Sequence, residues 1–184
     1  MCYFIEVEHL YDLEKQEKWE DVRKLLYSMW AHDSLNIGKH IRLFAECWLI
    51  LAEWDCLAGT QPLSFQVFQD TLIECTEFGI KNFMNIPQFL CVSGYMMSLF
   101  PYLFYTGDND LYSLWEQKGV EMLHKAHALD PSSKVAEILS LGCSQTNIER
   151  YNALKSQLQP EISTLFPRVT MVELYFKDVL SLAS

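Results

Sequence analysis

The sequence predicts an all-α fold, with eight or nine helices arranged as antiparallel helical hairpins in a repeat-like superhelix or bundle. Half of the 184 residues are hydrophobic and 14% are aromatic, which provides ample material for a core. Only 7 Gly and 6 Pro occur, too few for the frequent turns of a β-sandwich. Apolar residues recur at helical spacing, and no long strand-like alternation competes with them. We expect a single helical domain over residues 1–184.

The expected helices are bounded by residues that start or stop helices. In order, they cover about 3–14, 19–30, 34–58, 63–83, 87–100, 111–129, 133–142, 146–158 and 167–182. Expected caps are Asp33 or Ser34 for the third helix, which Gly59 ends, and Ser132 or Ser133 for the seventh. Pro62 and Pro87 lie at first-turn positions. Three of the expected helices end just before a proline, because proline cannot continue a helix without strain. These prolines are Pro101, Pro131 and Pro160.

The segment from Asn82 to Gly107 contains no charged residue, and 83–105 is long enough to cross a bilayer. Two prolines and several polar side chains interrupt it. A helix buried on all sides by other helices explains this composition, so we expect no membrane span.

The segment from Gly119 to Pro131 resembles the second helix of a tetratricopeptide repeat. That helix has a small residue, a bulky apolar residue, a second small residue and a proline just after its end. The corresponding residues here are Gly119, Leu123, Ala126 and Pro131. Gly107 falls where the first helix would carry its small residue, and Leu141-Gly142 resembles the start of a following repeat. The resemblance implies paired helices that approach closely at small residues. It also implies one possible function, a scaffold or chaperone that binds peptide segments of a partner protein.

The charge of the chain limits the classes of partner. It carries 24 acidic and 14 basic side chains, for a formal net charge of −10. This balance argues against direct binding of nucleic acid or of anionic lipid, and it favours a basic protein partner. The six cysteines form no C-x-x-C pair, and the N-terminus lacks the basic region of a signal peptide. We therefore expect a cytoplasmic protein with reduced thiols.

Motifs for catalysis, phosphate binding or metal binding are missing from the sequence. We accordingly expect no catalytic residues, no cofactor, no metal and no small-molecule ligand. An enzyme with an unrecognised site stays the least supported alternative.

Acidic residues gather in the middle third of the chain. Between Arg42 and Lys81 there is no basic residue. At 100° per residue, Asp70, Glu74 and Glu77 lie within about 60° of one another, opposite the apolar face of their helix. We expect a similar outward pair, Glu46 and Glu53, on the preceding helix. The five predicted partner-binding residues are Glu46, Glu53, Asp70, Glu74 and Glu77. The alternative is that this face is merely solvated.

A small, acidic, helical chain with one charged face is similar to bacterial immunity proteins of the contact-dependent inhibition type. The similarity extends to a C-terminal helix ending near residues 174–180. It implies binding to a cognate, basic, nuclease-type toxin. Carboxylates of this chain would then contact the Lys and Arg side chains with which the toxin binds phosphates.

Overall fold

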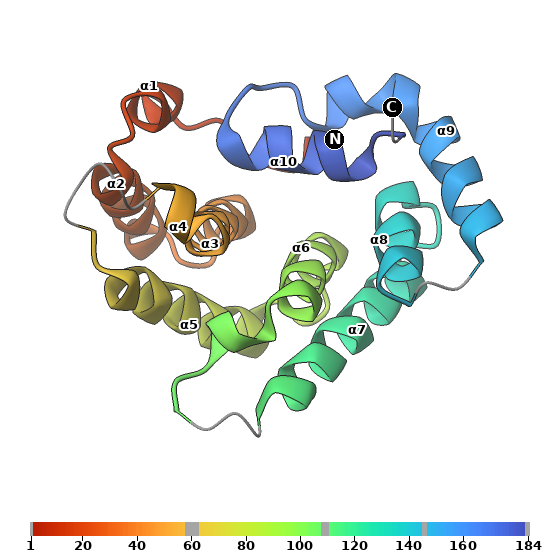
Figure 1. Cartoon of the computed structure of the whole chain (residues 1–184), viewed down its shortest axis with the longest axis horizontal. Coiled ribbons are helices and arrows are strands. Elements are labelled where there is room, and N and C mark those ends of the chain that lie inside the picture. Colours follow the sequence, from red (N-terminus) through yellow and green to blue (C-terminus); the bar gives the residue numbers. More distant parts are fainter. Residues whose placement is uncertain (1, 58–62, 108–110, 145–146, 183–184) are drawn as a thin grey trace.

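The computed structural model describes residues 2–57, 63–107, 111–144 and 147–182 (Figure 1). Within these ranges the chain forms ten α-helices and one short 3-10 helix, and no strand. The predicted all-α fold class is therefore confirmed. The helices are α1 Leu10–Lys15, α2 Trp19–His32, α3 Ile37–Ala52, α4 Trp54–Leu57, α5 Phe65–Asn82, α6 Pro87–Leu99, η1 Pro101–Phe104, α7 Tyr112–Leu129, α8 Lys134–Ser144, α9 Ile148–Leu165 and α10 Met171–Leu180.

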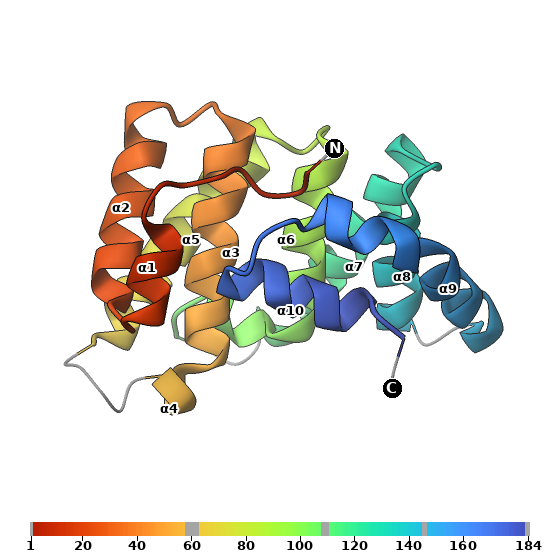
Figure 2. The same cartoon turned by 90° about the horizontal axis from the view of Figure 1, so that it is seen from above.

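Helix α3 is the centre of the N-terminal half of the chain. It contacts α2, α5, α6 and α10, and every residue from His40 to Leu51 is buried. Figures 1 and 2 show α1 and α10 on one side of α3 and α5 on the other. Apolar residues occupy most of the circumference of α3, with Arg42 and Glu46 on the remaining side, so neighbouring helices must cover the whole helix.

Several helix ends differ from the sequence prediction. The first helix begins at Leu10 and not at residue 3; Tyr3 instead donates its N–H to the carbonyl of Leu165, at 3.0 Å. Asn36, rather than Asp33 or Ser34, caps α3, because its side chain accepts the N–H of Lys39. The expected stop at Gly59 and start at Pro62 lie outside the described residues. The seventh expected helix does have its predicted cap, since Ser133 accepts the N–H of Ala136.

Helix α9 continues through Pro160, where the sequence predicts that it ends. Leu154 and Leu158 before the proline, and Ile162 after it, are all buried on one stripe of the helix. Burying such side chains contributes about 1.5–3 kcal/mol each, which offsets the roughly 3 kcal/mol cost of an internal proline.

Helices α6 and α7 pack closely against each other. A Cβ added to Gly94 would lie 2.7 Å from the carbonyl oxygen of Gly119, and one added to Gly119 would lie 2.6 Å from that of Gly94. The small residue at Gly119 therefore does allow close approach, but its partner is Gly94. The resemblance placed Gly107 in the first helix of a repeat. This expectation is wrong, because Gly107 has φ +101° in the turn after η1, with open space around it.

The uncharged segment 83–105 divides into α6 and η1, with Pro101 starting the second. Residues 89–97 of α6 are buried against other helices. Across the described part of the chain, none of the helices combines the length and apolar character needed to span a bilayer.

Candidate functional site

Three of the predicted partner-binding residues share one exposed face. Asp70, Glu74 and Glu77 all lie on α5 with exposed side chains. Glu74 accepts a hydrogen bond from the hydroxyl of Tyr27 on α2 at 3.2 Å, and Asp70 accepts one from Gln66 at 2.7 Å. In the described residues, no ion pair reaches any of the three carboxylates. We refer to Asp70, Glu74 and Glu77 as the α5 acidic face.

The other two predicted residues do not extend this face. Glu53 is exposed at the C-terminal end of α3. Burial raises the pKa of Tyr175 on α10, and the nearby Glu53 carboxylate adds to the rise. The expectation that Glu46 faces outward is wrong, since its side chain is only 1% exposed. Periodicity does place Glu46 away from the main apolar face of α3, but α1 and α10 cover that side as well (Figure 2).

Glu46 belongs instead to a buried charge cluster around Arg42. The Arg42 guanidinium lies 3.4 Å from Glu46 on its own helix and 3.4 Å from Glu14 on α1. It also lies 3.8 Å from Glu173 on α10. We call Arg42, Glu14, Glu46 and Glu173 the Arg42 cluster. Arg42 and Glu46 are each 1% exposed, and Glu173 is fully buried.

Local hydrogen bonds position two of the cluster's carboxylates, Glu14 and Glu173, from outside α3. Glu14 accepts the N–H of Met171, the first residue of α10, at 2.8 Å. Glu173 accepts the hydroxyl of Thr170 at 2.7 Å, so that both residues serve the N-terminus of α10. These bonds attach α10 to α1 and to the centre of the molecule.

Burial controls the protonation of the cluster. It raises the pKa of Glu46 to about 8, with Arg42 acting in the opposite direction and Glu14 and Glu173 adding to the rise. Burial likewise raises the pKa of Glu14, against the effects of the Met171 N–H and of Arg42. Glu46 is therefore largely neutral at pH 7, because three ionised carboxylates around one guanidinium would leave uncompensated buried charge.

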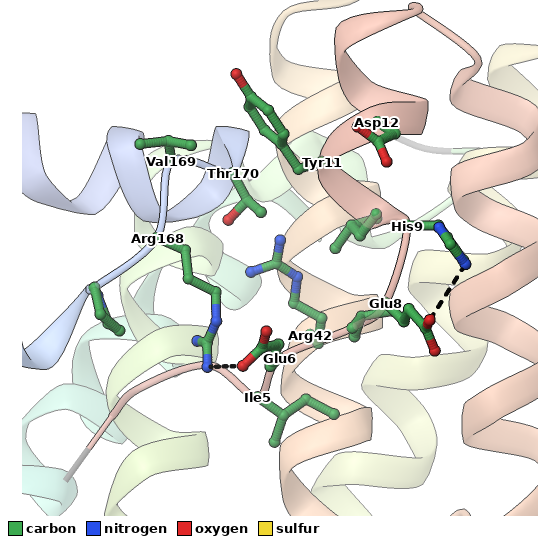
Figure 3. Close-up of a pocket in the computed structure, with 13 residues that line it drawn as sticks. Ile5, Glu6, Glu8, His9, Tyr11, Asp12, Arg42, Arg168, Val169 and Thr170 are labelled. Atoms are coloured by element: carbon green, nitrogen blue, oxygen red, sulfur yellow. Dashed lines mark hydrogen bonds and ion pairs between the residues drawn. The ribbon is translucent and has the colours of Figure 1, made fainter.

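A cavity of about 440 Å³ opens beside this cluster. The residues around it are Ile5, Glu6, Val7, Glu8, His9, Leu10, Tyr11, Asp12, Arg42, Pro167, Arg168, Val169 and Thr170. Figure 3 shows Arg42 and Arg168 extending into the space between the N-terminal segment and the segment before α10. Arg168 donates to the carbonyl of Phe4 at 2.9 Å and pairs with Glu173 at 3.3 Å.

The sequence prediction missed Arg42, Glu14, Glu173 and Arg168. Two local signals were present. Arg42 and Glu46 form a charged i, i+4 pair inside an otherwise apolar helix, where charges need partners. Thr170 and Glu173 have the spacing of a capping box. Neither signal reveals that the two places meet, because they are more than 120 residues apart in the chain.

The described residues contain no group of three or more His, Cys, Asp or Glu side chains arranged to hold a metal ion. What the geometry offers is an exposed anionic face on α5 and, apart from it, a cavity with two guanidinium groups. Neither a protein-family model, nor a curated protein, nor a solved structure matches the chain.

Proposed function

We propose that this chain binds a basic protein through the α5 acidic face, and that it acts as an immunity protein for a nuclease-type toxin. The supporting observation is the alignment of three exposed carboxylates on α5 without a cationic partner in the described part of the chain. Lys81 lies on the same side at the C-terminal end of α5 and leaves the face with a net negative charge.

The energetics of the helix favour an external role for these side chains. Like charges spaced at i, i+4 and i, i+3 cost an isolated helix a few tenths of a kcal/mol each. Cationic side chains of a basic partner would attract these carboxylates and offset the repulsion between them. The partner would also be steered to the face over long range, with an association rate that falls as salt is added.

Inhibition would follow from occlusion. A nuclease binds phosphates with clustered Lys and Arg side chains, and carboxylates presented on a rigid helix can engage those same groups. Glu74 is suited to this role because the Tyr27 hydroxyl holds its carboxylate in place while leaving it exposed.

The proposal is tested by capturing partners from cells of the source organism on wild-type protein and on the variant D70K/E74K/E77K. A matched variant, E116K/E121K/E149K, changes the net charge equally at three exposed positions on α7 and α9. We expect wild-type protein and the matched variant to retain a basic protein and to neutralise its nuclease activity. Affinity for that protein should fall about 100-fold or more in the α5 variant.

Equal retention by the two variants would show that the α5 acidic face is only solvated surface. Capture of a partner that is not basic, or that has no nuclease activity, would likewise contradict the proposal.

A further inference from the structure

The cavity beside Arg42 is separate from the α5 acidic face, because α1, the N-terminal segment and α10 lie on the opposite side of α3 (Figures 1 and 2). Its volume of about 440 Å³ lies within the range of small-molecule sites, roughly 300–1,000 Å³. It is therefore large enough for a small organic ligand.

At the base of the cavity, two nitrogen atoms of Arg42 lack a hydrogen bond to any of the described residues, although Nη1 lies 3.8 Å from a carboxylate oxygen of Glu173. The Nε and Nη1 atoms of Arg42 are buried, and neither has a hydrogen-bond partner in the described part of the chain. Leaving a buried donor unsatisfied costs about 1–3 kcal/mol, and more for a charged group. In Figure 3 the guanidinium of Arg42 is directed into the space that the other lining residues surround. An acceptor atom of a ligand placed there would satisfy it.

The wall of the cavity provides a second guanidinium, that of Arg168, and one of its partners, Glu6, is exposed. Nη2 of Arg168 lies 3.4 Å from a carboxylate oxygen of Glu6, and the Glu6 side chain is 82% exposed. Such exposed pairs contribute under about 1 kcal/mol. A ligand carboxylate that loses water inside the cavity could displace Glu6 from Arg168.

The surroundings of the two arginines limit the ligand to one negative charge. Glu14 and Glu173 already lie beside Arg42, and Glu8 and Asp12 line the cavity, so a second ligand charge would be repelled. The apolar part of the lining is formed by Ile5, Val7, Leu10, Pro167 and Val169. A ligand with one carboxylate and an apolar body matches both features.

We propose that this cavity binds a small organic monocarboxylate. The ligand carboxylate pairs with Arg168 in place of Glu6, Arg42 donates to an acceptor atom at the base, and the hydrocarbon part packs against the apolar wall. This site does not depend on the proposed toxin binding, which uses the other side of α3.

The probe is hexanoate, titrated into the protein by isothermal titration calorimetry, with 1-hexanol and inorganic phosphate as comparison ligands. We expect hexanoate to bind with a Kd of about 1 mM or tighter, in keeping with its few heavy atoms. Hexanol and phosphate should each bind at least about 10-fold more weakly, since one lacks the charge and the other lacks the apolar body.

The variant E6Q removes the competing carboxylate from Arg168 without altering a buried residue. E8Q is its matched control, because Glu8 also lines the cavity and its side chain is 89% exposed, but its ion pair is with His9. We expect E6Q to raise the affinity for hexanoate about threefold or more. The factor by which E8Q raises it should be less than half of the factor for E6Q.

The assignment fails if hexanoate does not bind wild-type protein or E6Q, or if hexanol binds as tightly. It also fails if E6Q and E8Q have the same effect on hexanoate affinity, because Arg168 would then not be the carboxylate partner.

Discussion

Glu46 shows how one buried side chain ties the stability of this fold to pH. Charged or titratable groups reach it from three helices: Arg42 on α3, Glu14 on α1 and Glu173 on α10. Desolvation outweighs the attraction of Arg42, so the folded protein holds the Glu46 proton up to a pKa of about 8. An unfolded chain releases the same proton near pH 4.5.

Because the folded pKa is raised above the unfolded value, the free energy of unfolding falls as pH rises from about 4.5 to 8. The variant E46Q keeps the shape of the side chain and cannot ionise. We expect it to match wild-type protein below about pH 4.5 and to be more stable above pH 8, by about 5 kcal/mol. Urea unfolding at a series of pH values measures both curves.

The matched control is E53Q at the C-cap of the same helix, where the carboxylate is exposed. Its stability should follow the wild-type curve at every pH. An E46Q curve parallel to that of wild type would mean that Glu46 is ionised in the folded protein.

At the scale of elements, the α6–α7 pair depends on two glycines that face each other. Gly94 and Gly119 let the two backbones approach so closely that neither position has room for a Cβ. The atoms around Gly94 include the Gly119 carbonyl oxygen and the Leu123 nitrogen, both in the backbone, which cannot move aside as the end of a flexible side chain could. The packing of α7 therefore depends on the absence of a side chain.

The variant G94A should destabilise the protein although alanine is the better helix former. Its Cβ would lie 2.7 Å from the Gly119 oxygen and 2.9 Å from the Cβ of Met122. We expect a loss of about 2 kcal/mol in the free energy of unfolding, measured by denaturant titration.

G142A in α8 is the control, because the nearest atom to a new Cβ there is a ring carbon of Tyr151 at 3.4 Å. It should leave stability unchanged or raise it by up to about 1 kcal/mol. Equal effects of G94A and G142A would contradict the close approach of α6 and α7.

At the scale of the whole molecule, the Arg42 cluster joins parts that are distant in the sequence. Glu14 accepts the N–H of Met171, 157 residues further along the chain. Arg168 donates to the carbonyl of Phe4, 164 residues away. The N-terminal segment, α1, α3 and α10 thus share one buried polar network, and α10 is attached through it to the central helix.

Replacing Arg42 with Met would leave the buried carboxylates of the cluster without their central cation. We expect R42M to lower the free energy of unfolding by about 3–5 kcal/mol, as is usual when one partner of a buried ion pair is removed. Amide hydrogen exchange should show α1 and α10 losing protection together, because the network holds both.

R150M is the comparison, since it removes an arginine whose pair with Glu137 is at the surface. It should leave stability and exchange essentially unchanged. If R42M proved no more harmful than R150M, the cluster would not be what attaches α10.

Local chemistry was sufficient for much of this structure. The 3.6-residue period located the helices, and the prolines and caps set many of their ends, because both act through the nearest turn of the chain. The exposed face of Asp70, Glu74 and Glu77 was also predictable, since one side of α5 is covered and the opposite side is not. Whether that face binds a partner stays a prediction.

Only the tertiary structure decided the rest. Periodicity orders residues around a helix axis, but it does not say how many sides neighbouring helices will cover. Glu46 and Glu53 therefore looked alike in sequence, and α1 and α10 buried the first while the second stayed exposed. Two pairings likewise depend on which distant segments pack together, namely Gly119 with Gly94 and Arg42 with Glu173. Local sequence does not determine this packing, because the free energy of burial is a sum over the whole fold.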